Sequence, residues 1–383
     1  MLEEFLNAKP LFYDTIDYDR MPRIYARIAH HFVLPKIIHL VGTNGKGTTG
    51  RFLATALLRQ NKRVGHYTSP HICSFNERIW LGGRDVPMEQ LDQIHLQLLA
   101  LLKPQEKEAL SYFEYTTLLA MLLYSKEKCD YVVLEAGLGG EHDATAVFGS
   151  DLTLITPIAK DHEAFLGETL REIATTKSQA IDKAAIIAKQ KDPLVIEIAQ
   201  SIAKEKGARF YKAEDLLSDT ETMIAADVAE KEKLPEYLCD NLLHAMAALH
   251  YLGEDFKAAD FYGARLFGRM TPIASNIIVD VGHNPLAATA LKKALRGRKF
   301  SLVYNSYRDK EYKKILFLLS PLIVEVLVID IEGSRAEERT KLIAVLDELG
   351  LDHSDFTKVE ADKEYLVFGS FSVVDAFLKV YNG

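Results

Sequence analysis

Short apolar runs along the chain alternate with longer segments in which apolar residues recur every three or four positions. The runs at 37–41, 131–135, 152–156 and 184–188 are continuous, which is typical of buried strands, and the segments between them have the helical period. Strands that alternate with helices usually form a parallel sheet covered by helices on both faces. The pattern predicts an α/β fold with a mostly parallel N-terminal sheet flanked by helices.

A second, smaller alternating series begins after Gly268 and Pro272 interrupt the pattern. Each of its apolar runs is followed by a helical segment, and the runs occupy 277–281, 300–305, 325–330 and 364–370. We therefore predict two domains, an N-terminal one at 1–268 and a smaller, Rossmann-like α/β domain at 269–383. The 383-residue length agrees with two domains of roughly 100–200 residues or somewhat more.

Composition narrows the class of protein. With 48% hydrophobic residues and a net charge of −8, the chain is a folded protein without the clustered basic charge that a nucleic-acid binder needs. Cys73, Cys129 and Cys239 are far apart and show no CxxC spacing, which fits a reducing cytoplasm. The N-terminus lacks the basic start and apolar core of a signal peptide, and no apolar run reaches the ~18 residues of a membrane span.

A glycine-rich loop, GTNGKGT at 42–48, joins the first predicted strand to a helix that should begin near Lys46. Glycines let the backbone wrap an anion, helix N-terminal amides point at it, and the lysine neutralises it. The loop departs from the strict Walker pattern, because position 40 is leucine and a glycine follows the lysine. It predicts a phosphate cradle, and the alternative is a plain strand-to-helix turn with a surface lysine.

Three oxygen or nitrogen donors follow the ends of predicted strands. Thr48 lies in the loop, Glu135 ends the run at 131–135, and His162 follows the run at 152–156. Because α/β sheets gather ligands at the carboxyl ends of their strands, these side chains are candidate magnesium ligands. Taken alone, Glu135 could cap a turn and His162 could be an ordinary loop histidine.

The ordered motifs resemble those of the folylpolyglutamate synthase/dihydrofolate synthase family, a branch of the Mur-type ligases. The matching segments cover nearly the whole chain and include HLVGTNGKGTTG, TSPHICSFNERI, FEYTTLLA, VVLEAGLGGEHDAT, DHEAFLGETLREIA, FGRM and VDVGHNP. The resemblance implies an ATP- and Mg²⁺-dependent amide ligase that joins L-glutamate to a pteroate-type carboxylate through an acyl phosphate. It also implies a P-loop-type N-terminal domain.

The resemblance assigns roles to residues of the N-terminal domain. Lys46 and the loop hold the ATP phosphates, and two Mg²⁺ ions are held by Thr48, Ser69, Glu135 and His162. Lys177 corresponds to a lysine that CO₂ carbamylates, although TKSQ replaces the usual EKAG around it. As a residue on its own, Lys177 could instead be a solvated helix lysine. The implied catalytic residues are Lys46, Glu135, His162 and Lys177, and the implied ATP-binding loop residues are Thr43, Asn44, Gly45, Lys46, Gly47 and Thr48.

Further ATP ligands are implied beyond the loop. Asn241 matches the first asparagine of an HNxxN helix, whose second asparagine is replaced by His244. Arg269 in FGRM matches the arginine of a PGR motif, and Asp280 and His283 match a DGAHNP motif of the second domain. Catalysis should therefore require domain closure over ATP. Without the resemblance, His283 could cap the following helix, although Asn284 suits that role better.

The TSPHICSFNER segment is implied to shape the acid site. Its predicted substrate-binding residues are Ser69, Pro70, His71, Phe75 and Arg78. An aromatic ring there could stack on a pterin. Phe75 could equally be part of the core.

Three functions remain open at this point. The first is a cytoplasmic, monomeric ligase that acts both on dihydropteroate and on reduced folates. The second is a related Mur-type ligase with another acid or amine, which the TSPH and FNERI motifs oppose. The third is a nucleotide-binding regulator without catalysis, opposed by the presence of Lys46, Thr48, Glu135 and His162.

Overall fold

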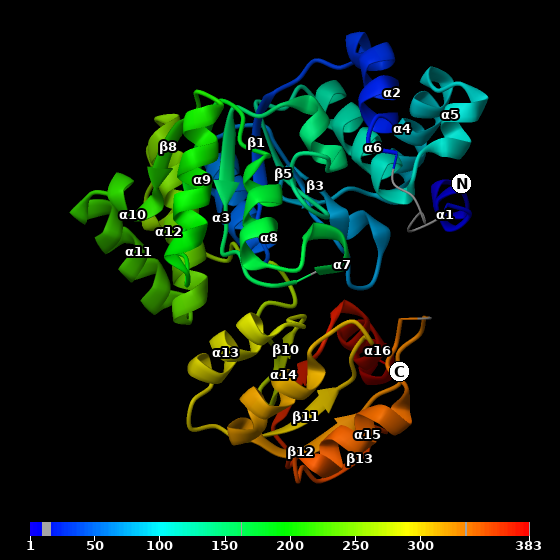
Figure 1. The fold of residues 1–383 in the computed structure, drawn as a ribbon, viewed down its shortest axis with the longest axis vertical. Helices are drawn as coiled ribbons and strands as arrows, with labels where there is room; N and C mark the ends of the chain where they lie inside the picture. The colour runs from blue at the N-terminus through cyan, green and yellow to red at the C-terminus, as the bar shows by residue number, and fades with distance from the viewer. Residues whose placement is uncertain (10–16, 162, 334, 383) are drawn as a thin grey trace. The chain divides into compact units, whose positions relative to one another are not determined.

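The computed structural model describes residues 1–9, 17–161, 163–333 and 335–382. The chain forms two compact units, Met1–Ala264 and Arg265–Gly383. The division lies a few residues before the predicted boundary at 268/269. Each unit is an α/β layer structure with its own sheet (Figure 1).

The sheet of the first unit has eight strands in the order β4-β3-β2-β5-β1-β6-β7-β8. Its six strands from β2 to β8 run parallel, and the short β3 and β4 add an antiparallel hairpin at one edge. The predicted mostly parallel sheet is confirmed. The strands are β1 (Lys36–Val41), β2 (Val64–Tyr67), β3 (Ile79–Leu81), β4 (Arg84–Asp85), β5 (Tyr131–Glu135), β6 (Leu152–Ile155), β7 (Ala184–Ile187) and β8 (Arg209–Lys212).

The central strands are continuous apolar runs because both faces of the sheet are covered. All of β2, β5, β6 and β7 is buried, and so is β1 after Lys36. The register pairs Leu40 with Glu135 and Val41 with Ile155. The carboxyl ends of the neighbouring strands β5, β1 and β6 therefore lie side by side, and the glycine-rich loop begins there.

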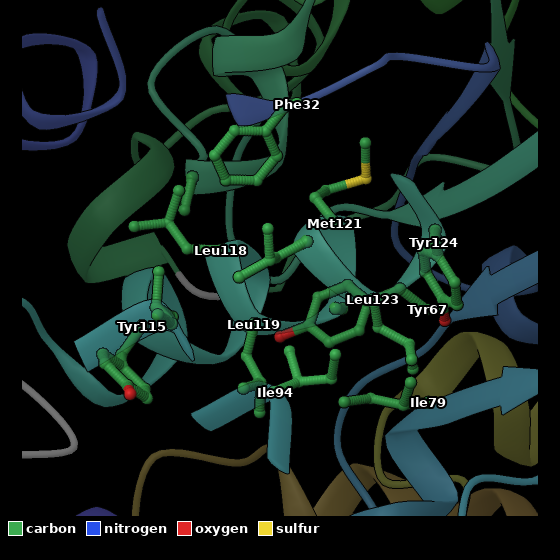
Figure 2. Packing of buried hydrophobic residues seen from close by; sticks show 14 of the residues in the cluster. Phe32, Tyr67, Ile79, Ile94, Tyr115, Leu118, Leu119, Met121, Leu123 and Tyr124 are labelled. Atoms are coloured by element: carbon green, nitrogen blue, oxygen red, sulfur yellow. The ribbon is translucent and has the colours of Figure 1, made fainter. Parts of the chain in front are cut away.

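Three hydrophobic clusters cover the faces of this sheet. One surrounds α6, whose side chains are buried on nearly every side, and Figure 2 shows Leu118, Leu119, Met121 and Leu123 of this helix in the cluster that also contains Tyr67 of β2. A second cluster holds α3 and α12, and a third packs α8 and α9 on β6 and β7. The helix α12 is followed by Gly253 in the left-handed conformation. The helices of eight or more residues are α2 (Arg20–Ile28), α3 (Lys46–Arg59), α4 (Met88–Leu101), α6 (Tyr112–Lys126), α8 (Leu170–Ser178), α9 (Pro193–Glu205), α11 (Asp219–Lys231) and α12 (Glu236–Leu252). The shorter ones are α1 (Leu2–Asn7), α5 (Pro104–Ala109), α7 (Glu163–Leu166) and α10 (Ala213–Leu216).

The second unit has a six-stranded sheet in the order β13-β12-β11-β14-β10-β9, in which only β9 is antiparallel. Its strands are β9 (Thr271–Ala274), β10 (Ile277–Asp280), β11 (Phe300–Tyr304), β12 (Ile323–Val328), β13 (His353–Asp355) and β14 (Tyr365–Phe368). Its helices are α13 (Pro285–Ala294), α14 (Tyr312–Leu319), α15 (Arg339–Glu348) and α16 (Phe371–Asn382). The predicted two-domain α/β class is confirmed.

Candidate active site

The glycine-rich loop is held in place by the segment that follows β6. The backbone amides of Thr43 and Asn44 donate to the carbonyl oxygen of Pro157, at 2.9 and 3.3 Å. Gly42 and Gly45 have φ angles of 143° and 91°, which side-chain-bearing residues rarely adopt. A Cβ on Gly42 would also lie 2.0 Å from Thr156 Oγ1. The two glycines thus let the chain turn tightly before α3 begins at Lys46, as the sequence predicted.

The threonines of the loop have different surroundings. Thr43 Oγ1 donates to the carbonyl oxygen of Ala159 at 3.0 Å and accepts from the Ala159 amide at 3.1 Å. Its side chain therefore stabilises the loop itself. Thr48 is buried in the first turn of α3, beside Gly47.

Two lysines converge on the loop. Lys46 Nζ donates to the carbonyl oxygen of Gly42 at 3.1 Å, and Lys177 Nζ donates to the same oxygen at 3.0 Å. Glu135 Oε1 lies 3.8 Å from Lys46 Nζ, and Glu135 Oε2 accepts from the backbone amide of Ser69 at 3.3 Å. The structure therefore brings together Lys46, Glu135, Ser69 and Lys177 from four separate segments.

Lys177 is not a solvated helix lysine. It lies near the end of α8 and is 5% exposed. Burial lowers its pKa from 10.5 to about 7, and the positive charge of Lys46 adds to this shift. A large share of Lys177 side chains is therefore neutral near pH 7.

Asn241 contributes to the same site from α12. A Cβ on Gly45 would lie 2.5 Å from Asn241 Oδ1, so the amide lies against the phosphate loop. His244, at the second position of the motif, points elsewhere. Its Nε2 lies 3.0 Å from the carbonyl oxygen of Ile186 in β7, and burial lowers its pKa to about 4. Its side chain is buried and directed to β7.

The segment after β2 is a loop fixed by Glu77. The Glu77 carboxylate accepts from the backbone amides of Ile72, Cys73 and Ser74 at 2.7 to 2.8 Å. This role of Glu77 was not predicted from the sequence. The carboxylate fixes the path of the chain just after Pro70.

The predicted acid-binding side chains of this segment divide into two groups. Arg78 Nε donates to His71 Nδ1 at 2.7 Å, and the Arg78 guanidinium lies 5.1 Å from the centre of the Tyr112 ring. Phe75 is 6% exposed and belongs to the hydrophobic cluster around α6, where its ring meets that of Tyr112 edge-on. The structure thus favours the core role for Phe75, and Tyr112 is an aromatic neighbour that the sequence analysis missed.

A second glycine-rich loop follows β5, in the segment AGLGGEHDAT at 136–145. The Asp143 carboxylate accepts from the backbone amides of Leu138 and Thr145 at 2.8 and 3.0 Å. A Cβ on Gly140 would lie 2.5 Å from the carbonyl oxygen of Thr176 and 2.7 Å from that of Lys177. This loop therefore packs directly against the backbone that carries the Lys177 side chain.

The second unit carries Arg269, Asp280 and His283. The Asp280 carboxylate accepts from the amides of Met270 and Gly282, both at 2.8 Å, and so joins the turn after Arg269 to the end of β10. The Arg269 guanidinium lies 5.2 Å from the centre of the Phe371 ring. His283 Nδ1 lies 3.1 Å from the Val281 carbonyl oxygen.

Asn284, and not His283, caps α13. Its Oδ1 accepts from the Ala287 amide at 2.9 Å.

His162 lies outside the described residues. Among the residues that the structure describes, no group of three or more His, Cys, Asp or Glu side chains forms a metal cluster, and no helix has the length and apolar character to cross a bilayer.

Comparison with known proteins places this arrangement in a family. Residues 40–234 match the Mur ligase middle domain. A dihydrofolate synthase/folylpolyglutamate synthase of Haemophilus influenzae is 30% identical over 94% of this chain and 92% of its own length.

Solved structures agree with the sequence comparison. The crystal structure of Helicobacter pylori folylpolyglutamate synthetase is 40% identical with a TM-score of 0.80, and the match covers 100% of this chain and 98% of that one. A bifunctional folylpolyglutamate synthase/dihydrofolate synthase with Mn, AMPPNP and L-glutamate bound is 27% identical with a TM-score of 0.83, over 98% and 96% of the two chains. The chain therefore belongs to the Mur ligases and, within them, to the dihydrofolate synthase/folylpolyglutamate synthase family.

Proposed function

We propose that this protein is an ATP-dependent ligase that adds L-glutamate to dihydropteroate and to reduced folates. The observation that carries this proposal is the meeting of Lys46, Lys177 and Glu135 at a glycine-rich loop that opens a helix. Membership of the family and the bound ligands named for its relatives support the choice of substrates.

The chemistry requires an activated acid. A carboxylate is a poor electrophile, so the γ-phosphoryl group of ATP first passes to it and gives an acyl phosphate and ADP. The amine of glutamate then attacks the carbonyl carbon, and the tetrahedral intermediate collapses to the amide as phosphate leaves and a proton is released. Lys46 and the amides of the loop hold the β- and γ-phosphates, and Asn241 supports Gly45 where the loop turns into α3.

The donor set at the loop fits magnesium. Thr48 and Ser69 supply hydroxyl groups and Glu135 a carboxylate, which are the hard oxygen ligands that Mg²⁺ prefers. When bound, the ion neutralises charge on the phosphates. The resemblance adds a second ion with His162, a residue outside the described ranges, as a ligand.

We further propose that Lys177 is carbamylated. Reaction with CO₂ needs a neutral amine, and the lowered pKa of Lys177 provides one. The nitrogen of the neutral amine forms a bond to the carbon of CO₂ and releases a proton, which turns a buried neutral amine into a carbamate anion near Lys46. With isotope-labelled bicarbonate, the wild-type protein should give a carbamate signal in carbon NMR that Lys177→Ala lacks. Absence of this signal from the wild-type protein would overturn the proposal.

By the resemblance, Arg269, Asp280 and His283 also bind ATP. We test this with Arg269→Met, which should raise the KM for ATP, against Arg298→Met as a control on an exposed arginine of the same unit. We also propose that the protein is a monomer that works in the cytoplasm, and the free thiols of Cys73, Cys129 and Cys239 are compatible with a reducing compartment.

The deciding experiment measures ADP release by the purified protein with Mg-ATP and L-glutamate. The acids compared are dihydropteroate, tetrahydrofolate and none. Turnover with both acids establishes both activities, and turnover with one assigns a single role. ATP binding without acid-dependent turnover would overturn the proposal. It would leave either a ligase with another acid acceptor or a non-catalytic regulator. A single-turnover quench distinguishes these two, because only a ligase forms an acyl phosphate.

A further inference from the structure

A buried row of polar groups connects β1 with the loop that follows β5. His39 on β1 is 2% exposed, and its Nε2 lies 2.7 Å from Thr145 Oγ1. The same hydroxyl lies 2.5 Å from Asp143 Oδ1. Asp143 also accepts from the amides of Leu138 and Thr145, which closes the loop 138–145 upon itself.

The direction of these hydrogen bonds follows from proton counting. A hydroxyl has one proton, and a carboxylate can only accept. Thr145 Oγ1 therefore donates to Asp143 and accepts from His39 Nε2. Burial lowers the pKa of His39 to about 4, so its ring is neutral near pH 7 and its single proton lies on Nε2.

The loop 138–145 contacts the backbone of one of the proposed catalytic residues, Lys177. Gly140 packs on the backbone of Lys177, while Thr43 is held separately by Pro157 and Ala159. Loosening the loop should therefore displace Lys177, and with it the hydrogen bond from Lys177 Nζ to Gly42, while the contacts of Thr43 keep the rest of the phosphate loop in place. Displacements of this kind lower the rate of the chemical step.

We propose that His39, as the Nε2–H tautomer, is a positioning residue that acts through Thr145 and Asp143 to hold the loop 138–145 against Lys177. It touches neither ATP nor the acid in this role. The inference rests on the proposed function for its kinetic consequence, whereas the tautomer itself does not depend on that function.

Matched substitutions at Thr145 test the kinetic part. Thr145→Val keeps the shape of the side chain and removes the hydroxyl, and it should lower kcat about 10- to 100-fold with the KM for ATP unchanged within about twofold. Thr145→Ser keeps the hydroxyl and should restore most of kcat. Thr117→Val makes the same change at a buried threonine of α6 and should leave kcat within about twofold. Equal kcat values for Thr145→Val and wild type, or equal losses in Thr145→Val and Thr145→Ser, would overturn the proposal.

Substitutions of His39 should follow the same logic. His39→Leu should match Thr145→Val, the double variant should be no worse than either single one, and His39→Gln, whose amide donates, should restore part of kcat. Additive losses in the double variant would contradict the proposed path.

Proton–nitrogen correlation NMR of the imidazole in the wild-type protein tests the tautomer directly. The expected result is a protonated Nε2 from pH 6 to 8, and a protonated Nδ1 would overturn the proposal. A wild-type protein without acid-dependent turnover would refute the proposed function alone, because the tautomer is measured without substrate.

Discussion

Lys46 and Lys177 donate to one carbonyl oxygen, that of Gly42, from 3.1 and 3.0 Å. The two side-chain amino groups therefore lie next to each other at the phosphate loop. Their surroundings differ, because Lys46 also faces Glu135 while Lys177 is buried behind it. We therefore expect replacement of Lys46 to affect mainly the rate of ADP release, and replacement of Lys177 to change the pH dependence of stability.

Lys46→Met removes the cation and keeps most of the side-chain length. Acid-dependent ADP release should fall about 100-fold or more, because the charge that develops on the transferred phosphoryl group loses its fixed counter-charge. Steady-state ADP release measures this effect. Lys62→Met, which breaks the ion pair with Glu254, is the control and should leave turnover unchanged. Full turnover in Lys46→Met would contradict the assigned role.

The buried Lys177 should make the stability of the CO₂-free protein depend on pH. The pKa of Lys177 in the folded protein, about 7, lies below the ordinary 10.5. Below pH 7 the native state therefore contains a buried ammonium group, and the full free-energy cost of burying that charge lowers its stability. Between pH 7 and 10.5 the unfolded chain binds more protons than the native state at this site, so stability rises with pH. We expect a gain of roughly 2–5 kcal/mol across this window.

Urea denaturation at pH 7 and pH 9 measures the part of this gain that falls between those two pH values, as the difference between wild type and Lys177→Met. The Met variant has no titrating group at position 177, so subtracting it removes the contribution of all other groups. A wild-type minus variant difference that stays constant between the two pH values would contradict a buried, neutral Lys177.

The sequence predicted the central strands and the phosphate loop well. Continuous apolar runs mark strands covered on both faces, and Lys46 with its neighbouring glycines is a local signal. The short β3 and β4 were missed because β4 is exposed and polar and has no hydrophobic pattern. With three residues in β3 and two in β4, neither strand is long enough to show a period.

Contacts between distant segments were harder to predict. His39 looks like one polar residue in an apolar run, and only the fold shows that it reaches Thr145. Phe75 fits both a substrate contact and the core by its residue type, and burial against Tyr112 favours the core. The pKa of Lys177 likewise depends on what surrounds α8, which local sequence does not encode.

Gly140→Ala should inactivate or destabilise the protein, because the added Cβ meets backbone oxygens of Thr176 and Lys177 at 2.5 and 2.7 Å. Backbone there can move only if the end of α8 shifts. Gly137→Ala, in the same loop, meets the Phe113 ring at 2.6 Å, and a side chain can rotate away. We expect Gly140→Ala to lose at least about tenfold more kcat than Gly137→Ala, measured by ADP release beside thermal unfolding. Equal behaviour of the two variants would show that Lys177 is not held by this contact.

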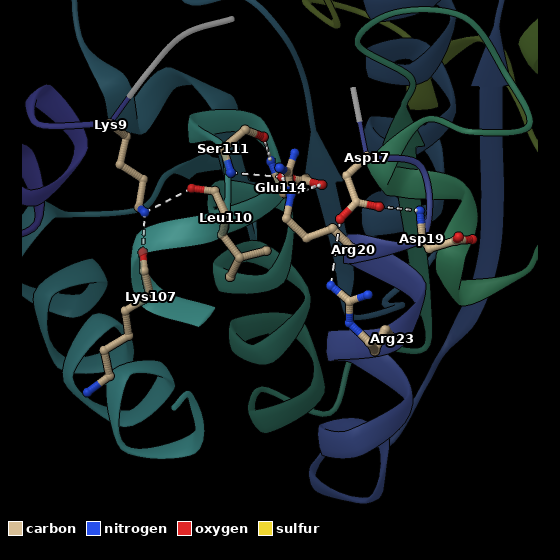
Figure 3. A network of polar contacts seen from close by, with 9 residues as sticks. All are labelled: Lys9, Asp17, Asp19, Arg20, Arg23, Lys107, Leu110, Ser111 and Glu114. Atoms are coloured by element: carbon tan, nitrogen blue, oxygen red, sulfur yellow. Dashed lines mark hydrogen bonds and ion pairs between the residues drawn. The ribbon is translucent and has the colours of Figure 1, made fainter. Parts of the chain in front are cut away.

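A buried ion pair should stabilise the region in front of α6. Figure 3 shows Arg20 and Glu114 side by side, and Arg20 Nε lies 3.1 and 3.0 Å from the two carboxylate oxygens of Glu114. Both side chains are about nine-tenths buried. Glu114 also accepts from the Ser111 amide at 2.8 Å. Removing one partner leaves a buried charge without its counter-charge, so Arg20→Ala should cost about 3–5 kcal/mol in the free energy of unfolding.

The exposed pair of Arg298 and Glu364 provides the control for this loss. Arg298→Ala breaks a pair whose side chains are 46% and 48% exposed, so its cost should stay below about 1 kcal/mol. The double variant Arg20→Met/Glu114→Leu replaces the buried charges with apolar side chains and should be more stable than Arg20→Ala alone, although the Ser111 amide then lacks its acceptor. Urea unfolding of the four proteins measures these differences. If Arg20→Ala costs no more than Arg298→Ala, the buried pair contributes no more than a surface one, and the packing of α2 against α6 must come from its apolar side chains.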